Sequence, residues 1–499
     1  MINLNQASTM STIGIGIVLI LVTITIALCA ILVWLITKNI KSDNKNYNRY
    51  YLIIIVAGGV IVRFVLSLFF GGFRDLSLTY KNIVESFSIT GGMGEFYDRF
   101  IGEIFPLPYY LILILGGLSR ALGFAVTTAE SMVFIKFPLI IADAITILLL
   151  NKIASKYINE KVGLIIAGAY AFSPVFIIES GIYGSTIAYL IPLLIWAGYS
   201  LVNKRHFQAI FAYSLAMITH ILAVYAFPVF VIYFGYRFIR SIIVSINAKK
   251  AGAKGLKSKL CIKIPVYSIV SFITIYLICL PISLSSIGAN PLVFIYSLTL
   301  KPLASVYYFS NNGISIYNLF GRNAIELGNS FPTAIFIIIF ALIICGIISV
   351  VYFSKRNTAS VCLILTHISY TVITYYVGAN LTDIVVICAL LLLSYILTQD
   401  KRILTVFALT SLSATIASIT ALDNANCLNM YEISYFYKTV FQITDGVALV
   451  FLIVSSVISI ISHIYLSFTL LDITIANKRK LLAYDENATI TSSINNLFK

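Results

Sequence analysis

The stretch TAIFIIIFALIICGIISVVYF, residues 333–353, decides the fold class because it is long, apolar and free of charged side chains. A helix needs about 20 mostly apolar residues to cross a bilayer, where no water satisfies open backbone groups. Runs of this kind recur along the 499 residues, of which 60% are hydrophobic and only 11% are charged. Soluble chains have about 45–50% apolar and about 25% charged residues. The sequence therefore predicts an all-α integral membrane protein whose helices pack as one bundle.

A net charge of +15 could indicate a nucleic-acid-binding protein. The positions of the basic residues decide whether it does. Most of the 34 Lys and Arg residues lie in short polar breaks between apolar runs. An excess of Lys and Arg marks the cytoplasmic loops of membrane proteins, so we expect these breaks inside and no nucleic-acid partner. The basic breaks are residues 38–49, 152–161, 204–205, 237–263, 355–356, 401–402 and 478–480.

With these breaks inside, we expect about 13 transmembrane helices, an outer N-terminus and a cytoplasmic C-terminus, in the plasma membrane. Residues 1–471 then form a single transmembrane domain with outer loops at about 73–130 and 285–332, and residues 472–499 form a polar, flexible tail. The expected spans are residues 11–37, 51–72, 131–151, 162–178, 185–202, two arms within 208–236, 264–284, 333–353, 359–377, 384–398, 403–422 and 446–466.

Two apolar segments are not expected to form simple membrane crossings. The run LPYYLILILGGL, residues 107–118, is too short for a comfortable span, and counting it would move every later basic break outside. We therefore expect an interfacial helix within the long first outer loop. Residues 208–236 have basic breaks on both sides, so we expect a re-entrant hairpin of two short helices turning near Thr219 and His220. A lone histidine at such a turn serves either a site or local packing.

Most of the 19 acidic residues fall in outer loops or at outer helix ends, so any chemistry is expected on the outer face. Asp75 follows the second span directly, and a carboxylate held at a helix end by the membrane surface suits a general base. An ordinary interfacial acid is the alternative. The four histidines are scattered, without metal-ligand spacing.

Three charged residues lie inside expected spans, where charges are costly and usually face a cavity or one another. Lys136 and Asp143 are two helical turns apart and share a helix face. Arg63, in the second span, is expected to pair with Asp143 across helices. The pair is either a structural ion pair or part of a site.

Five passages resemble, in order, the GT-C type of glycosyltransferase, which takes its sugar from a polyprenyl-phosphate carrier outside the cytoplasm. Asp75 stands at the position of the family's first-loop catalytic Asp. Many relatives continue Gly-Gln-x-Asp where this chain reads Gly184-Ser185-Thr186-Ile187, and carry Lys-Pro-Gln where it reads Thr219-His220-Ile221. The other four passages are EIFPLPYYLIL (103–113), KFPLIIAD (136–143), SPVFIIESGIYGS (173–185) and NNGISIYNLFGRN (311–323).

The resemblance implies transfer of a sugar, of the mannosyl or glucosyl kind, from a polyprenyl- or dolichyl-phosphate donor to a lipid, glycan or protein acceptor. Asp75 would deprotonate an acceptor hydroxyl, and preorganised positive charge would stabilise the departing lipid phosphate. Cations alone would need no metal cofactor, and a divalent ion held by Asp75 and a second acid stays open. Candidate phosphate or sugar ligands are Arg74, Arg99, Lys136, His220 and Arg322, with Arg63, Asp143 and Tyr183 as supporting residues.

Two other functions stay open on the sequence. A lipid-linked sugar transporter or flippase would use the intramembrane charges as a substrate path, but transporters usually show two related halves, and here the loops are lopsided. A catalytically silent relative, acting as a subunit of a membrane complex, would account for the replaced family residues. In every case membrane lipids surround the protein.

Overall fold

A computed structural model describes residues 45–70, 83, 104–122, 129–250, 260–284, 290–304, 306, 308–328, 331–354, 359–424, 443 and 446–475. These residues form fifteen α-helices, two short helices of other types and one pair of two-residue strands. The all-α prediction is thereby confirmed for the described part of the chain. The expected first span, residues 476–499 of the expected tail, and Arg74, Asp75 and Arg99 lie outside the described residues. Residues 472–475, which were expected to begin that tail, instead end a helix.

The α-helices are α2 (Lys45–Phe69), α5 (Pro106–Ala121), α6 (Ala129–Tyr157), α7 (Glu160–Phe172), α8 (Pro174–Ile177), α9 (Ile187–Val202), α10 (His206–Met217), α11 (Leu222–Lys250), α12 (Leu260–Ser283), α13 (Pro291–Ala304), α14 (Phe331–Ser354), α15 (Ala359–Tyr375), α16 (Ile384–Thr398), α17 (Lys401–Asn424) and α18 (Gly446–Ile475). The remaining elements are the π-helix η1 (Ile178–Tyr183), the 3-10 helix η2 (Ile316–Phe320), β1 (Ser310–Asn311) and β2 (Ala379–Asn380).

Seven of the described helices, α2, α6, α11, α12, α14, α17 and α18, are long and apolar enough to cross a membrane. The segment α7–α8–η1 adds an eighth crossing if its two parts, which are bent by 52°, form one broken span. Pro174 explains the break, because proline lacks the N–H that would continue the helix and disfavours helical backbone before it. The molecule is therefore a multi-pass helical membrane protein.

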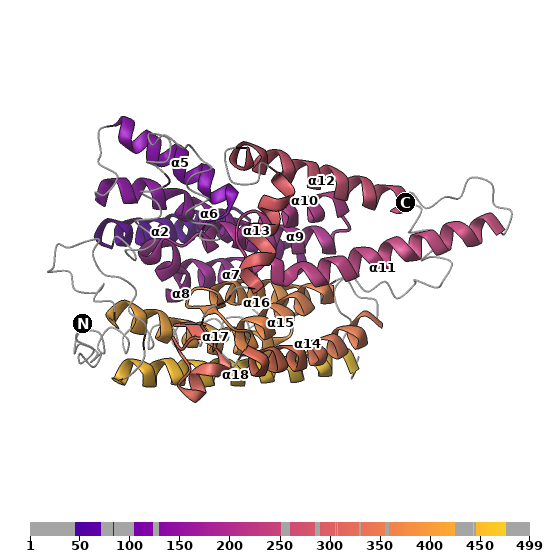
Figure 1. Ribbon diagram of the computed structural model, residues 1–499. Coiled ribbons are helices and arrows are strands. Elements are labelled where there is room, and N and C mark those ends of the chain that lie inside the picture. The colour runs from indigo at the N-terminus through magenta and orange to yellow at the C-terminus, as the bar shows by residue number, and fades with distance from the viewer. Residues whose placement is uncertain are drawn as a thin grey trace.

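The helices form two groups that meet along α16. Figure 1 shows α2 and α5–α12 in one group and α14, α15, α17 and α18 in the other. Helix α16 contacts α6 and α9 as well as α15 and α17, and all of its residues are buried. A helix that is hydrophobic on every side belongs in a protein interior, which explains its central place.

One end of the bundle gathers the basic breaks. Lys156 donates a hydrogen bond to the Asn203 side chain, and Gln399 Nε2 donates to the Tyr157 carbonyl at 3.1 Å. The C-terminal ends of α6, α9 and α16 therefore meet, and the breaks 152–161, 204–205 and 401–402 lie at the same end. We call this the basic end of the bundle. Its composition agrees with the rule that loops on the cytoplasmic side are rich in Lys and Arg.

Helices α10 and α11 form the expected hairpin, with its turn at residues 218–221. The rings of Tyr213 and Phe230 stack at 3.8 Å, and those of His206 and Phe234 meet edge to face at 5.9 Å, so the helices run antiparallel. The expectation of two short arms is wrong for the second arm: α10 has 12 residues but α11 has 29. The basic residues after Tyr236 are compatible with a helix and continue it, and α11 extends well past its neighbours in Figure 1.

The segment between α13 and α14, which the sequence predicts to be the second outer loop, is ordered by buried asparagines. Asn323 donates to Asn312 Oδ1 at 2.9 Å and to the Ile443 carbonyl at 2.7 Å, while Asn318 donates to Ser456 Oγ at 2.9 Å. Strand β1 of this loop pairs in parallel with β2, in the turn between α15 and α16. Gly313 permits the contact, since a Cβ there would lie 2.1 Å from the Ala379 carbonyl oxygen. The loop is thus anchored on the turn that contains Asp383.

Candidate functional site

A buried ion pair joins the first helices of the bundle, as the sequence predicted. Arg63 Nε on α2 lies 2.8 Å from Asp143 Oδ2 on α6. Tyr170 donates its hydroxyl to Asp143 Oδ1 at 2.6 Å, and Ser180 of η1 donates to Oδ2. Both charged side chains are essentially inaccessible to solvent. The carboxylate is therefore surrounded by donors, which is the condition for keeping a charge inside the bundle.

Arg63 also caps the broken span. Its guanidinium donates to the carbonyls of Ala171 at 2.7 Å and Tyr170 at 3.4 Å, in the last turn of α7. The last four carbonyls of a helix have no partner within the helix, and Pro174 prevents the chain from supplying one. Arg63 supplies these missing donors, so a single side chain both neutralises Asp143 and stabilises the bend before η1.

Lys136, a candidate phosphate ligand, is fully buried, and its ammonium group donates to backbone carbonyls. These are Phe70 at 2.6 Å, Ile182 at 2.8 Å and Gly181 at 3.3 Å. Gly184 has a positive φ of 71°, and a Cβ there would lie 2.9 Å from Lys136 Cε, so glycine is needed for this packing. Lys136 thus fixes η1 to the end of α2, five residues before Asp75 in the sequence. To bind a phosphate it would have to exchange one of these carbonyls.

Two buried carboxyl groups each have an oxygen without a hydrogen-bond partner in the described structure. Glu179, in η1, is 2% exposed, and its Oε1 has no hydrogen-bond partner. Asp383, in the turn before α16, is 3% exposed, and its Oδ1 has none either. The two groups lie within electrostatic range of each other, and Tyr225 of α11 lies within range of Asp383. Buried polar atoms without a partner are rare in native proteins, and those that occur often have a functional role or bind a water or an ion.

Asp383 is held by its own turn. Its Oδ2 accepts a hydrogen bond from the Asn380 backbone N–H at 2.9 Å. Burial raises the pKa of the Asp383 carboxyl to about 7, and the Asn380 hydrogen bond opposes part of this rise. The group therefore titrates near neutral pH, where a proton donor or acceptor is most effective.

We expect Asp383→Asn to raise the melting temperature of the protein at pH 8 and to have a smaller effect at pH 5. The folded-state pKa is higher than the unfolded value of about 3.9, so the carboxyl stabilises the fold at low pH and that stability is lost as pH rises toward 7. Asparagine has no proton to lose and keeps an oxygen for the Asn380 N–H. Thermal unfolding in detergent at both pH values, with exposed Glu326→Gln as control, checks this; equal shifts at both pH values would contradict it.

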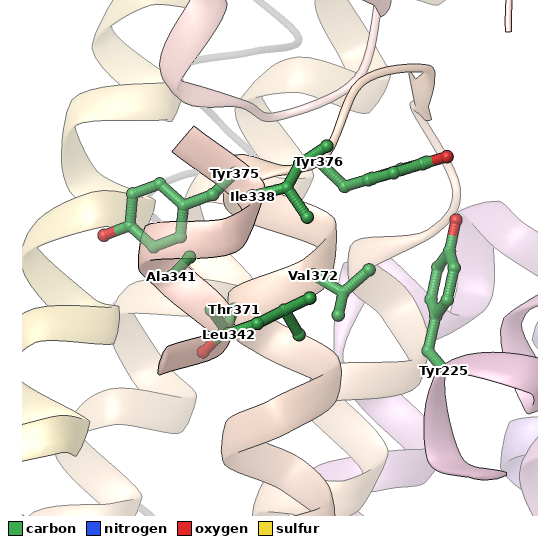
Figure 2. Close-up of a pocket in the computed structure, with 8 residues that line it drawn as sticks. All are labelled: Tyr225, Ile338, Ala341, Leu342, Thr371, Val372, Tyr375 and Tyr376. Atoms are coloured by element: carbon green, nitrogen blue, oxygen red, sulfur yellow. The ribbon is translucent and has the colours of Figure 1, made fainter. Parts of the chain in front are cut away.

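An apolar pocket of about 160 Å³ is lined in part by Tyr225, the residue that lies within electrostatic range of Asp383. It lies between α11, α14 and α15 (Figure 2). The hydroxyls of Tyr225 and Tyr376 point toward one side of it, and that of Tyr375 points away toward α18, where it contacts His463 Nδ1 at 3.3 Å. Since Tyr225 also lies near Asp383, the pocket has an apolar wall and a polar edge. The lining residues are Tyr225, Ile338, Ala341, Leu342, Thr371, Val372, Tyr375 and Tyr376.

The remaining predicted site residues lie apart from this pocket. His220, in the hairpin turn, stacks on Phe105 with ring centroids 6.3 Å apart, and its Nδ1 accepts from the Leu222 N–H at 3.3 Å. The same turn bonds to the start of α5, through Leu107 N–H and the Ile218 carbonyl at 3.1 Å. Arg322 is exposed beside the ring of Phe309. Tyr183 donates to the Ser418 carbonyl at 2.6 Å, which links η1 to α17.

Sequence reasoning identified the ion pair but did not single out Glu179 or Asp383 as site residues. A signal for Glu179 was present, because it interrupts an otherwise apolar passage within SPVFIIESGIYGS. Asp383 had no such signal, since an acid before an apolar helix is common. Within the residues that the structure describes, His, Cys, Asp and Glu do not gather in groups of three or more that could hold a metal ion.

The fold and the described residues together define a multi-pass helical membrane protein with two buried carboxyl groups and an apolar pocket that shares Tyr225 with the surroundings of Asp383. No family model matches the sequence, and a search of curated proteins finds no match either.

Proposed function

We propose that this protein is a GT-C type glycosyltransferase that moves a sugar from a polyprenyl- or dolichyl-phosphate carrier to an acceptor on the outer face of the membrane. Asp75 acts as the general base on the acceptor hydroxyl, and the lipid phosphate is the leaving group. The acceptor is a lipid, glycan or protein.

The observation that carries this proposal is the amphiphilic character of the site. The apolar pocket between α11, α14 and α15 suits an isoprenoid chain. The unpartnered oxygens of Glu179 and Asp383 suit hydroxyl groups, which donate hydrogen bonds to carboxylates. A lipid-linked sugar combines these two chemistries in one molecule. Most ligand pockets are similarly apolar with a few polar groups that fix orientation.

The proposed topology places the transfer reaction on the outer side of the membrane. We infer about 13 crossings in the plasma membrane, with the basic end of the bundle in the cytoplasm, the N-terminus outside and the C-terminal tail inside. Asp75, His220, Arg74, Arg99 and Arg322 then serve the outer half of the protein. The short helices α9, α15 and α16 contribute crossings to this count because neighbouring helices bury them.

The proposal is tested by narrowing the pocket. Ala341, on α14, is 8% exposed and lines the pocket, so Ala341→Trp should displace part of a bound isoprenoid chain. Losing the burial of two methylene groups, at ~0.8 kcal/mol each, should lower kcat/KM for a long-chain donor roughly tenfold. Sugar transfer by purified protein in nanodiscs, across a panel of polyprenyl-phosphate sugars, measures this.

Ile347→Trp is the matched control, since Ile347 lies on the same helix but is 59% exposed. If both substitutions lowered kcat/KM equally, the pocket would not be the binding site of the isoprenoid chain. Wild-type protein that binds none of the donors and transfers none of the sugars would instead favour a catalytically silent subunit.

A transporter of lipid-linked sugars is the second candidate, favoured by the broken α7–α8–η1 segment with a buried carboxyl group in it. Broken helices line substrate sites in many transporters. Proteoliposomes loaded with a fluorescent lipid-linked sugar distinguish the two: a transporter moves the intact molecule between leaflets, whereas a transferase releases the lipid phosphate.

A further inference from the structure

We propose that His367 of α15 and His463 of α18 form an intramembrane site that binds a single proton, held on His367. The two imidazole rings lie with their centroids 4.9 Å apart, and both side chains are buried. Helix α15 packs against α14 and α18, which are both long and apolar enough to cross a membrane. Histidines that face one another inside a membrane are costly and mark proton or ion sites. Neither histidine takes part in the proposed transferase activity.

A continuous chain of hydrogen bonds runs through the histidine pair. Its four inner side chains are buried, whereas the two at its ends, Ser467 and Tyr375, are partly exposed. A proton can therefore reach the buried rings from either end by exchange along the chain. In order, the members are Ser467, His367, Cys345, Thr371, His463 and Tyr375, with successive side-chain contacts of 2.8, 3.6, 2.8, 2.8 and 3.3 Å.

Thr371 determines which nitrogen of His463 carries a hydrogen. The threonine hydroxyl has a single hydrogen, which it donates to the His367 carbonyl oxygen at 2.8 Å, one helical turn earlier. The hydroxyl oxygen then accepts from His463 Nε2 at 2.8 Å, so this nitrogen is protonated. The other nitrogen, Nδ1, accepts from the Tyr375 hydroxyl at 3.3 Å. His463 is therefore fully satisfied as a neutral ring.

His367, in contrast, lacks one donor as a neutral ring. Cys345 donates its thiol hydrogen to Thr371 at 2.8 Å, so its sulfur is left to accept from His367 Nδ1 at 3.6 Å. Ser467 Oγ lies 2.8 Å from His367 Nε2, but its hydrogen is donated to the His463 carbonyl at 2.9 Å. Acceptors therefore face both ring nitrogens of His367, and a neutral imidazole has only one N–H. One additional proton completes the network, whereas a purely structural network would be complete with neutral rings.

The surroundings limit the pair to one proton. Two imidazolium rings at this separation would repel each other in the low-dielectric interior. Among the residues that the structure describes, no acid forms an ion pair with either ring. The titratable groups that face the pair are Cys345 of α14, Tyr370 and Tyr375 of α15, and Tyr317 of η2, whose hydroxyl donates to the Tyr375 carbonyl. A second positive charge would therefore have no counter-ion.

Solid-state nitrogen NMR of the full chain in lipid bilayers, with labelled histidine, tests the proposal because it distinguishes a protonated ring nitrogen from a bare one. The chain has four histidines, and His206→Gln and His220→Gln assign the two signals outside the pair. As the pH is lowered from about 8 to about 4, we expect His367 to become protonated on both nitrogens. His463 should keep its hydrogen on Nε2 and stay neutral, so that the pair takes up one proton in total.

Ser467→Ala tests the acceptor of the additional proton. It removes the partner of His367 Nε2 and should lower the midpoint of proton uptake by about one pH unit, as expected for the loss of a hydrogen bond to a charged group. Thr469→Ala is the matched control, because Thr469 is buried on the same helix and donates only to the Tyr465 carbonyl. This variant should leave the midpoint unchanged.

Four results would overturn the proposal. Both rings could remain neutral down to about pH 4, which would make the network purely structural. Both rings could become charged, or His463 alone could, and either result would contradict the donors and acceptors inferred from Thr371. Equal shifts in Ser467→Ala and Thr469→Ala would show that Ser467 does not accept from the charged ring. Size-exclusion profiles verify that each variant is folded.

Discussion

Replacing Arg63 with methionine is expected to abolish the accumulation of folded protein. The substitution leaves the Asp143 carboxylate buried without its counter-ion, at 2% exposure. It also removes the donors of the Ala171 and Tyr170 carbonyls at the end of α7. Breaking a buried pair in this way costs about 3–5 kcal/mol, a large fraction of the roughly 5–15 kcal/mol by which folded proteins are stable. Size-exclusion profiles of a fluorescent fusion in detergent measure the folded fraction.

The control and the rescue use the same helix and the same cluster. Arg49→Met removes an exposed cation from α2 and should leave the profile unchanged. The triple variant Arg63→Met/Asp143→Leu/Tyr170→Phe removes the stranded charge and the hydroxyl that depends on it, and should recover part of the folded protein. Folded Arg63→Met protein at wild-type yield would show that the pair is dispensable.

The rescued variant also separates the two readings of the ion pair. If the triple variant folds and transfers sugar, Arg63 and Asp143 are structural. If it folds without activity, the cluster also shapes the site. This is possible because Ser180, which donates a hydrogen bond to Asp143, directly follows Glu179 in η1.

The helices of this protein could be predicted from sequence because membrane insertion depends on local hydrophobicity. Each described apolar run became a helix, including the short run that begins α5, and the hairpin turn fell at His220. The ion pair was predictable for a related reason. Few charges lie in the spans, so Arg63 and Asp143 had few possible partners.

Features that depend on packing between distant segments were not predictable. Glu179 and Asp383 are far apart in sequence yet lie within electrostatic range of each other, and no local pattern encodes this. Lys136 was expected to bind a phosphate group. In the structure its ammonium group donates hydrogen bonds to the carbonyls of Phe70 and Ile182, and the position of Ile182 depends on the bend of the chain at Pro174. The sequence did contain an indication of that bend, because Pro174 lies within residues 162–178, which were predicted to form one continuous span.

The second large effect is expected at Asp75, where Asp75→Asn should lower kcat for sugar transfer by roughly 10²–10⁴-fold and leave donor binding unchanged. Asparagine keeps the size of the side chain but cannot accept the proton of an acceptor hydroxyl. A loss in kcat at constant KM identifies an interaction made in the transition state rather than in the bound substrate. Steady-state transfer and donor binding, measured on the same preparation in nanodiscs, separate the two. Exposed Glu326→Gln, in the segment between α13 and α14, is the matched control.

Glu179→Gln and Asp383→Asn make this test decisive, since both carboxyl groups are buried with one free oxygen each. If they hold the sugar, their loss should raise KM or weaken donor binding, whereas loss of the base should not. An active Asp75→Asn enzyme together with a Glu179→Gln enzyme that binds donor but cannot transfer would assign the base to Glu179. In that case Asp383, whose carboxyl titrates near pH 7, would be the group best placed to exchange the proton with it.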